Sequence, residues 1–204
     1  MDEIGLFPLG MVLLPTERVP LHIFEDQYKE LIDECIELEQ EFGLVLQDDD
    51  GIRESGTRAA IVTVLERFDD GRLNVVVEGR ERFRVVALTT GRTFRTADVE
   101  PLDDLEPDAD EGAIGAAVEN LRRVAELAGT DAEGLDPVTD APSFELAARV
   151  ELEPKLKQGL LESRSEGERL RRVARLLEGA AQALEARAER ARIASLNGHV
   201  KLRP

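Results

Sequence analysis

The sequence predicts an α+β protein with a β-rich first half and a helical second half. Up to about residue 103, β-branched and aromatic residues recur in short runs separated by turn signals, as in antiparallel strands of a barrel or sandwich. Beyond that point the apolar residues recur at helical spacing. The 204 residues, 42% of them hydrophobic, suffice for one domain, or one domain and a smaller appendage. We therefore expect a β-rich subdomain over 1–103, an acidic linker over 104–111 and a helical subdomain over 112–204.

Five runs in the first half have the composition of strands. They cover residues 42–47, 58–68, 73–78, 82–88 and 93–99. The second and third are joined by Asp70-Gly71, a strong hairpin signal because Gly accepts the positive φ of a tight turn. Gly79 is expected to end the strand formed by the third run, and residues 79–82 are expected to form a turn.

Four segments have helical periodicity. One helix is inserted among the strands between Asp26 and Glu39, with a stripe formed by Tyr28, Leu31, Ile32, Cys35, Ile36 and Leu38. The second half contains helices over 111–128 and 142–152, and Pro154 is expected to end or interrupt the latter. Ser165 and Glu168 form a capping box for a long last helix that continues to about Ser195.

Acidic residues dominate the charge, 43 against 26 basic ones, for a net charge of -17. A polyanion repels phosphate backbones, which disfavours nucleic acid as a partner. Between Thr96 and Leu121 there are nine acids and no base, hence the predicted linker. Residues 164–204 differ, with ten bases and five acids. Because Glu and Arg alternate there, a solvated, salt-bridged helix face is the usual explanation, and a docking surface for an acidic partner is the alternative.

The residues needed for common catalytic chemistry are missing from the sequence. One cysteine (Cys35) and two histidines (His22 and His199) provide neither a disulfide framework nor a Cys/His zinc site. There is no phosphate-binding loop with a trailing Lys-Ser/Thr and no Gly-x-Ser-x-Gly elbow. We therefore expect no enzymatic activity and no cofactor. The acidic start, the single cysteine and the short apolar run over 4–14 predict a cytoplasmic protein without a membrane segment.

The most informative stretch lies near the start of the chain. It reads LFPLGMVLLP over 6–15 and VPLHIFEDQY over 19–28. This stretch resembles the start of the N-terminal domain of Lon proteases, also called the LON substrate-binding domain. The resemblance continues through nearly the whole chain, at Phe42–Val45, Gly56–Val64, Asp70–Arg72, Val77–Gly79, Arg82–Val85, Asp136-Pro137, Phe144–Ala147, Lys157–Glu162 and Glu168–Leu170.

The resemblance implies a fold and a function, and it indicates which catalytic modules this sequence lacks. The fold is a PUA-like β pseudobarrel, mostly antiparallel with one inserted helix, followed by a C-terminal helical bundle that ends in a long helix. In the full-length proteases this domain helps to recognise unfolded or tagged polypeptides and contributes to assembly. The present sequence stops at Pro204, before the ATPase and Ser-Lys peptidase modules. We therefore expect a stand-alone, non-catalytic member of the family.

The residues that the resemblance highlights yield the candidate contact surface. The exposed polar residues nearest the signature are expected at the entry to the first helix, and the proposed contacts are His22, Phe24, Glu25, Asp26, Gln27 and Tyr28. Core packing is the usual role for an aromatic in a protein with no Trp, and a peptide groove is the alternative. The expected partner is an unfolded or extended polypeptide. An adaptor that docks on a folded partner, such as an ATP-dependent protease, and a PUA-like RNA or small-ligand binder remain alternatives.

Overall fold

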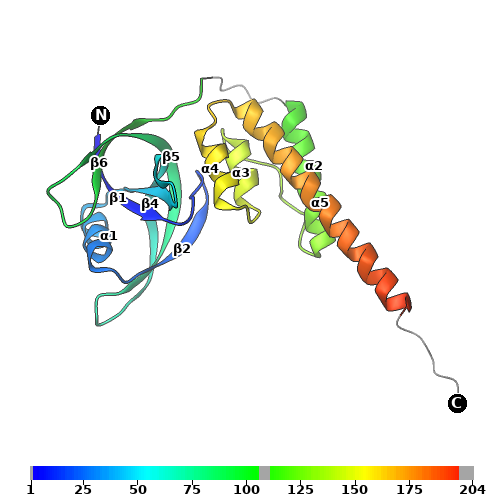
Figure 1. The fold of residues 1–204 in the computed structure, drawn as a ribbon, viewed down its shortest axis with the longest axis horizontal. Coiled ribbons are helices and arrows are strands. Elements are labelled where there is room, and N and C mark those ends of the chain that lie inside the picture. Colours follow the sequence, from blue (N-terminus) through cyan, green and yellow to red (C-terminus); the bar gives the residue numbers. More distant parts are fainter. Residues whose placement is uncertain (1, 106–110, 198–204) are drawn as a thin grey trace, which may run out of the picture. The chain divides into compact units, whose positions relative to one another are not determined.

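The computed structural model describes residues 2–105 and 111–197 and the side chains up to Ile193 (Figure 1). In chain order the elements are β1 (Asp2–Leu9), β2 (Arg18–Ile23), α1 (Asp26–Leu38), β3 (Phe42–Asp48), β4 (Gly51–Arg67), β5 (Leu73–Thr89), β6 (Thr96–Pro101), α2 (Glu111–Ala128), α3 (Pro142–Ala148), α4 (Pro154–Glu162) and α5 (Glu166–Asn197). The chain forms two compact units. The barrel unit comprises Met1–Glu106 with Ala147–Ser165, and the helical unit comprises Pro107–Leu146 with Glu166–Pro204.

The barrel unit is built from one six-stranded sheet in the order β2-β5-β4-β3-β1-β6. The sheet closes because β6 pairs with β1 on one side and with β5 on the other. Only β1 and β3 run parallel, while the other pairs are antiparallel. The predicted α+β class with a mostly antiparallel sheet is confirmed. Strand β2 pairs with β5 alone and therefore forms the edge.

Strand alternation and one helix fill the larger core. Along β5, Leu73, Val75 and Val77 are fully buried while the residues between them are partly exposed, as a strand with one face on the core requires. Helix α1 contributes its apolar stripe to this core, from Tyr28 to Cys35. The predicted helix over 26–39 is therefore confirmed to within one residue. None of the described helices is long and apolar enough to cross a membrane.

The predicted break at Gly79 is wrong, because β5 is one continuous strand. The segment before β2 runs against Gly79: the Thr16 N–H donates to the Gly79 carbonyl (2.8 Å) and the Gly79 N–H donates to the Glu17 carbonyl (2.9 Å). A Cβ at residue 79 would lie 2.1 Å from the Leu14 carbonyl oxygen. Glycine is thus needed for close backbone approach rather than for a turn.

The segment 147–165 differs from the sequence-based expectation. Helix α3 ends at Ala148, earlier than predicted, and Pro154 begins α4 instead of ending a helix. Proline suits the first helical turn because its missing N–H would have no partner there. Helix α4 packs within the barrel unit: Lys157 forms an ion pair with Glu17, and the Gln158 amide donates to the Ser55 carbonyl (3.2 Å). Tertiary contacts therefore place residues 147–165 with the barrel, whereas the sequence analysis assigned them to the helical subdomain.

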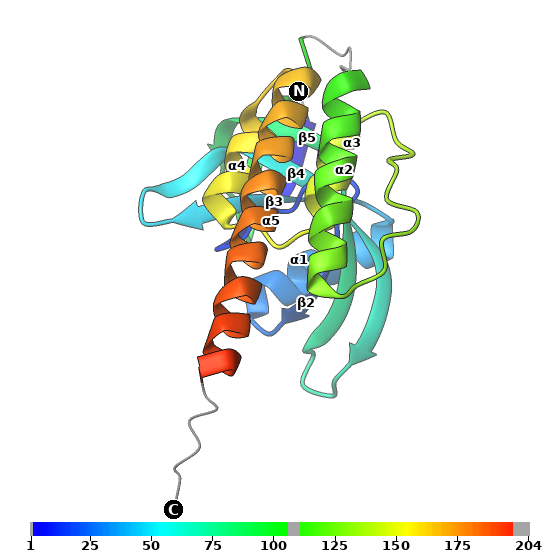
Figure 2. The ribbon, with the colours of Figure 1, turned by 90° about the vertical axis from the view of Figure 1, so that its right-hand side faces the viewer.

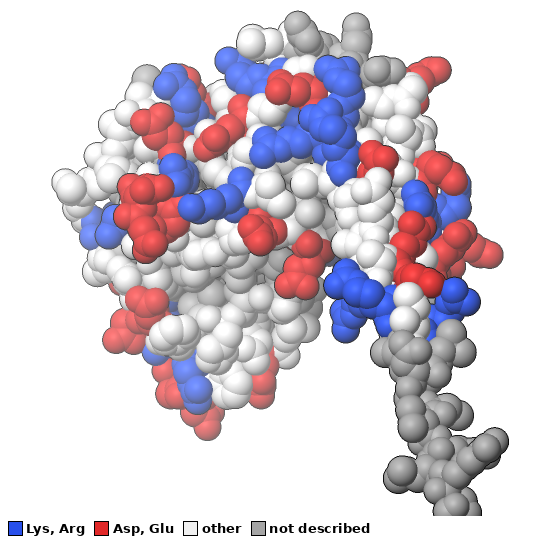
Figure 3. Space-filling model, turned by 45° about the vertical axis from the view of Figure 1, so that its right-hand side comes forward, with Lys and Arg blue, Asp and Glu red and all other residues white. Residues whose placement is uncertain are grey.

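The helical unit is organised by α2 and α5, which lie side by side (Figure 2). Leu121 of α2 and Val173 and Leu177 of α5 are buried. The Asn120 amide donates to the Ala174 carbonyl (3.0 Å), and Arg123 pairs with Glu185 (2.6 Å). On the face that Figure 3 shows, Lys and Arg side chains gather near the top, and acidic and basic side chains are mixed elsewhere. This face therefore carries both signs of charge.

A buried ion pair joins the start of α5 to the start of α3. Glu166 and Arg169 are each 1% exposed and pair with each other. The Glu166 carboxylate accepts from the Ser143 N–H (2.7 Å) and the Ser143 hydroxyl (2.8 Å), which satisfies donors in the first turn of α3. The Arg169 guanidinium also lies 4.4 Å from the centre of the Phe144 ring. Such a fully bonded pair stabilises one arrangement of the two helix ends.

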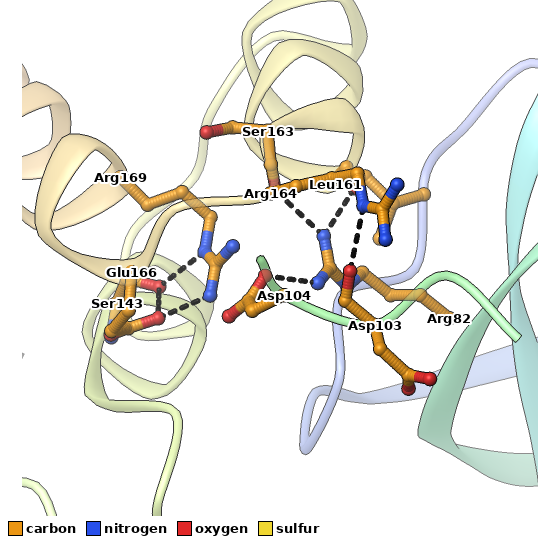
Figure 4. Close-up of polar contacts among 9 residues, drawn as sticks. All are labelled: Arg82, Asp103, Asp104, Ser143, Leu161, Ser163, Arg164, Glu166 and Arg169. Atoms are coloured by element: carbon orange, nitrogen blue, oxygen red, sulfur yellow. Dashed lines mark hydrogen bonds and ion pairs between the residues drawn. The ribbon is translucent and has the colours of Figure 1, made fainter. Parts of the chain in front are cut away.

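A second buried arginine, Arg82 of β5, joins three segments of the barrel unit (Figure 4). Its guanidinium donates to the carbonyls of Leu161 (2.8 Å) and Ser163 (2.7 Å) at the end of α4 and pairs with Asp104 (2.5 Å). Beside it, Arg164 donates to the Asp103 carbonyl (2.7 Å). The two carbonyls that Arg82 bonds lie at the end of α4, which leaves them without intrahelical partners.

Removing the Arg82 guanidinium should destabilise the barrel unit strongly. We expect Arg82→Met to lower the free energy of unfolding by about 3 kcal/mol, because it leaves the carboxylate of Asp104 and two carbonyls without their donor. Chemical denaturation measures this change. Arg84→Met is the control, since the Arg84–Glu100 pair is about half exposed and is worth less than about 1 kcal/mol. Equal losses for the two variants would contradict the prediction.

A methyl group at residue 79 should also be costly. We expect Gly79→Ala to lower the free energy of unfolding by about 1–3 kcal/mol, because the new Cβ overlaps the Leu14 carbonyl. Gly10→Ala is the matched control, since a Cβ at residue 10 meets nothing within 4 Å. The same denaturation experiment applies, and a neutral Gly79→Ala would show that the close approach is not rigid.

Candidate functional site

The six predicted contact residues lie around the junction of β2 and α1, but on different surfaces. His22 is the last exposed residue of β2, and Phe24 in the junction is 59% exposed. Tyr28 is buried, with its ring centre 4.1 Å from that of Phe7. Asp26 projects from the start of α1 and pairs with Lys29 (3.0 Å). Whether these residues bind anything stays a prediction.

His22 and Phe24 belong to an exposed aromatic cluster, which we define as His22, Phe24, Phe68 and Arg72. The rings of His22 and Phe24 are stacked with centres 5.9 Å apart, and Phe68 meets His22 edge-on at 6.2 Å. The Arg72 guanidinium lies 4.9 Å from the centre of the Phe68 ring. Because side chains alternate along β2, Val19 and Leu21 pack on the core while Pro20 and His22 face outward. The core-packing interpretation is therefore wrong for Phe24, and it is right for Phe7, Tyr28, Phe42 and Phe83.

A chain of polar contacts orients His22. The Asn74 amide nitrogen donates to Glu66 (3.1 Å), so its carbonyl oxygen faces His22 Nδ1 at 2.7 Å. That oxygen only accepts, and Nδ1 is therefore the protonated ring nitrogen of His22. The imidazole is held in one orientation by neighbouring strands and lies within the aromatic cluster.

The aromatic cluster shares Phe68 and Arg72 with a hairpin arm, which we define as residues 62–76 (Figure 1). Val62, Val64 and Leu65 of the arm are 37%, 42% and 59% exposed. Pairing between β4 and β5 is irregular here, with register shifts between Ile61 and Thr63 and between Val64 and Glu66. Such bulges bend a strand and re-aim its side chains. The outcome is a run of apolar residues without a core to cover it.

One side of the arm borders a hollow of about 640 Å³. The end of α1 and the residues after it provide Ile36, Glu39 and Glu41, and β4 provides Val62 and Val64. Burial, followed by the charge of Glu81, raises the pKa of the Glu41 carboxyl. The hollow thus combines an apolar wall with two carboxylates and the guanidinium of Arg80.

Glu25, Gln27 and Tyr28 line a different depression, which we call the polar hollow, of about 460 Å³. Its other walls are the end of β1, Gln47 and Arg95. Burial, and secondarily the charge of Glu25, raises the pKa of Tyr28, while Arg95 opposes the shift. The structure therefore separates the predicted contact residues into an aromatic surface and a polar hollow.

Sequence reasoning missed several residues of these surfaces. Phe68, Arg72 and Asn74 flank the Asp70-Gly71 turn, which the sequence marked only as a turn. The run Ile61–Leu65 lacks the clean alternation of a half-buried strand, which was the available signal of unusual exposure. Nothing in the sequence indicated that Arg95 belongs to a site, because its proximity to Tyr28 depends on the closed sheet.

The described residues offer little for catalysis. No three His, Cys, Asp or Glu side chains in the described part of the chain are placed to hold a metal ion. Burial raises the pKa of the Cys35 thiol to about 11. A buried thiol of high pKa is a poor nucleophile. His199 lies outside the described residues.

Comparison with known proteins identifies the family. Residues 3–179 match the family model of the ATP-dependent protease La (LON) substrate-binding domain. The chain belongs to this family of substrate-binding domains, and it is therefore a substrate-recognition module.

Several relatives are similar over much of the chain. The chain is 30% identical over 191 residues to a Lon protease of Paraburkholderia phytofirmans, covering 84% of this chain and 24% of the relative. It is 28% identical over 130 residues to a Lon protease of Parabacteroides distasonis, covering 59% of this chain and 16% of the relative. The chain thus spans a quarter or less of the length of these relatives.

Two solved structures share the fold. A Lon N-terminal domain protein from Xanthomonas campestris has a TM-score of 0.67 and 26% identity, covering 83% of this chain and 95% of that one. The N-terminal domain of a Mycobacterium avium complex Lon protease has the same TM-score and 20% identity, covering 89% and 98%. The second likeness concerns the fold alone.

The burial of Cys35 has a testable consequence. Because its pKa is about 11, about one-thousandth of the thiol is ionised at pH 8, and alkylation by iodoacetamide should be far slower in the native protein than in urea. Mass spectrometry of timed samples measures the two rates. In the native protein the rate should still be rising with pH above 9, where an ordinary thiol approaches its plateau. Equal native and denatured rates at pH 8 would contradict the burial.

Proposed function

We propose that this chain is a non-catalytic module that binds unfolded or extended polypeptide segments at the aromatic cluster and the hairpin arm. The observation that carries this proposal is the exposure of apolar side chains in both places. Phe24, Val62, Val64 and Leu65 are all more than a third exposed, in a chain of net charge -17. Val62, Val64 and Leu65 lie within four residues of β4, and contiguous exposed apolar surface is typical of protein-binding sites.

The edge of the sheet supports a mode of binding. Strand β2 has β5 as its single partner among the described strands, and no other backbone hydrogen bond is made by residues 18–23. An extended peptide can add to such an edge through main-chain hydrogen bonds, which tolerate many sequences. Pro20 removes one donor from the edge and so limits the strength of pairing. Binding is therefore expected to be reversible and micromolar or weaker.

The absence of catalysis belongs to the same proposal. The matched family is a substrate-binding domain, and the single thiol is buried. Proteolysis is named for relatives of which this chain spans a quarter or less, so it is not carried over. A cytoplasmic location, expected from the sequence, stays a prediction.

The alternative of a basic docking helix receives less support. Arg169 of α5 is buried on Glu166, and Arg192 pairs with Glu189 (2.9 Å). Arg123 of α2 lies against Glu185. The pairs of Arg169 and Arg192 neutralise part of the excess positive charge of residues 164–204. The same pairing weakens the RNA-binding alternative.

Removing the Phe24 ring tests the proposal. We expect Phe24→Ser to raise the Kd for fluorescein-labelled, carboxymethylated α-lactalbumin, a permanently unfolded polypeptide, about tenfold, because the variant loses the apolar area that the ligand covers. Fluorescence anisotropy measures the affinity.

Val138→Ser is the matched control, since Val138 is 90% exposed and lies in the helical unit. This variant should bind like the parent chain. The proposal is wrong if the parent shows no saturable binding, or if Phe24→Ser and Val138→Ser bind equally well.

A further inference from the structure

The polar hollow continues into a second depression of different chemistry. The second, which we call the apolar hollow, has about 300 Å³ and is lined by Leu46–Asp48 at the end of β3 and Glu153–Lys155 at the start of α4. Gly10 and Gln47 line both hollows. We refer to the two together as the groove, and every residue that lines it belongs to the barrel unit.

The groove contains two cations that an acidic ligand group can meet. Asp48 is engaged by Arg53 (2.6 Å), and Glu25, which accepts from the Gln27 amide (3.1 Å), and Glu153 are the remaining carboxylates of the lining. Arg95 and Lys155 form no ion pair with the residues that the structure describes. An arginine fork in such a position matches a carboxylate well.

The middle of the groove is suited to a peptide main chain. The Gln47 side chain is exposed, and its amide group has a donor and an acceptor side. A side-chain amide can therefore receive both a carbonyl and an N–H of an extended segment. Pro154 beside it is exposed and provides an apolar surface for a side chain, while Leu46 lines the hollow but is buried.

We infer that the groove binds an extended polypeptide segment in which an apolar side chain is followed or preceded closely by a carboxylate. The apolar side chain enters the apolar hollow, the carboxylate pairs with Arg95, and Gln47 holds the main chain between them. This inference rests on the proposed polypeptide binding and adds a second contact that selects sequence. A small free carboxylate would occupy the polar hollow alone.

Gly10 allows the groove to be blocked without disturbing the fold. Its φ is not positive, and a Cβ there meets no atom within 4 Å. A leucine at residue 10 would thus project into the shared part of the groove. Gly115 of α2 also has open space around it, so Gly115→Leu is a matched control in the helical unit.

The experiment uses fluorescein-labelled Gly/Ser peptides that contain one Leu and one Asp, adjacent or separated by one residue, in either order. Matched peptides carry Asn for Asp or Ser for Leu. We expect Arg95→Gln to weaken binding of the best Leu/Asp peptide about fivefold and to leave its Leu/Asn counterpart unchanged. Gly10→Leu should weaken both about tenfold, and Gly115→Leu neither. Acetate, added at a concentration equal to the Kd of the peptide, should not displace the peptide.

The outcomes separate this inference from the proposed function. If Arg95→Gln and Gly10→Leu bind the peptides like the parent while Phe24→Ser loses α-lactalbumin, the groove inference is wrong and the aromatic cluster stands. If neither α-lactalbumin nor any peptide binds the parent, the proposed function fails as well. Competition by acetate would overturn the peptide assignment. Should Gly10→Leu lose its cooperative thermal transition, Arg95→Gln alone decides, because Arg95 is exposed.

Discussion

The barrel unit depends on one buried guanidinium, that of Arg82. The chain leaves this unit near residue 106 and returns at Ala147, so nothing covalent holds α4 against the strands locally. Arg82 of β5 closes this gap by bonding the last carbonyls of α4 and the carboxylate of Asp104. A planar cation with several fixed donors can join three segments at once, whereas an apolar residue has no donor at all.

The groove is a consequence of that arrangement. Pro154 and Lys155 form a wall of the apolar hollow only because α4 is fixed to the barrel at its other end, around Leu161. The Lys157–Glu17 pair holds the helix along its length. Structural ion pairs and the proposed binding surface are therefore linked here: the buried charges orient the helix, and the helix forms a wall of the groove.

The exposed apolar residues and the high net charge of the chain are also related to each other. Val64 of the hairpin arm pairs with the buried Val75, yet Val64 and Leu65 are exposed because no layer covers them. Exposed apolar strands promote self-association. A net charge of -17 counteracts it through repulsion between copies of the chain. A surface of this kind can remain available for a transient polypeptide partner, which accords with membership of a substrate-binding family.

Local pattern in the sequence was sufficient for the class of fold, for α1 and α2, and for the family, because helical periodicity and the ordered motifs of residues 6–28 are properties of short segments. Tertiary structure alone decided what depends on distant approach. Residue 79 is a glycine within a strand because the backbone of Leu14 passes close to it. Pro154 begins a helix that packs on the barrel. Phe24 and Phe42 are the same residue type in the sequence, yet one is exposed and the other buried, since only the closed sheet defines an inside.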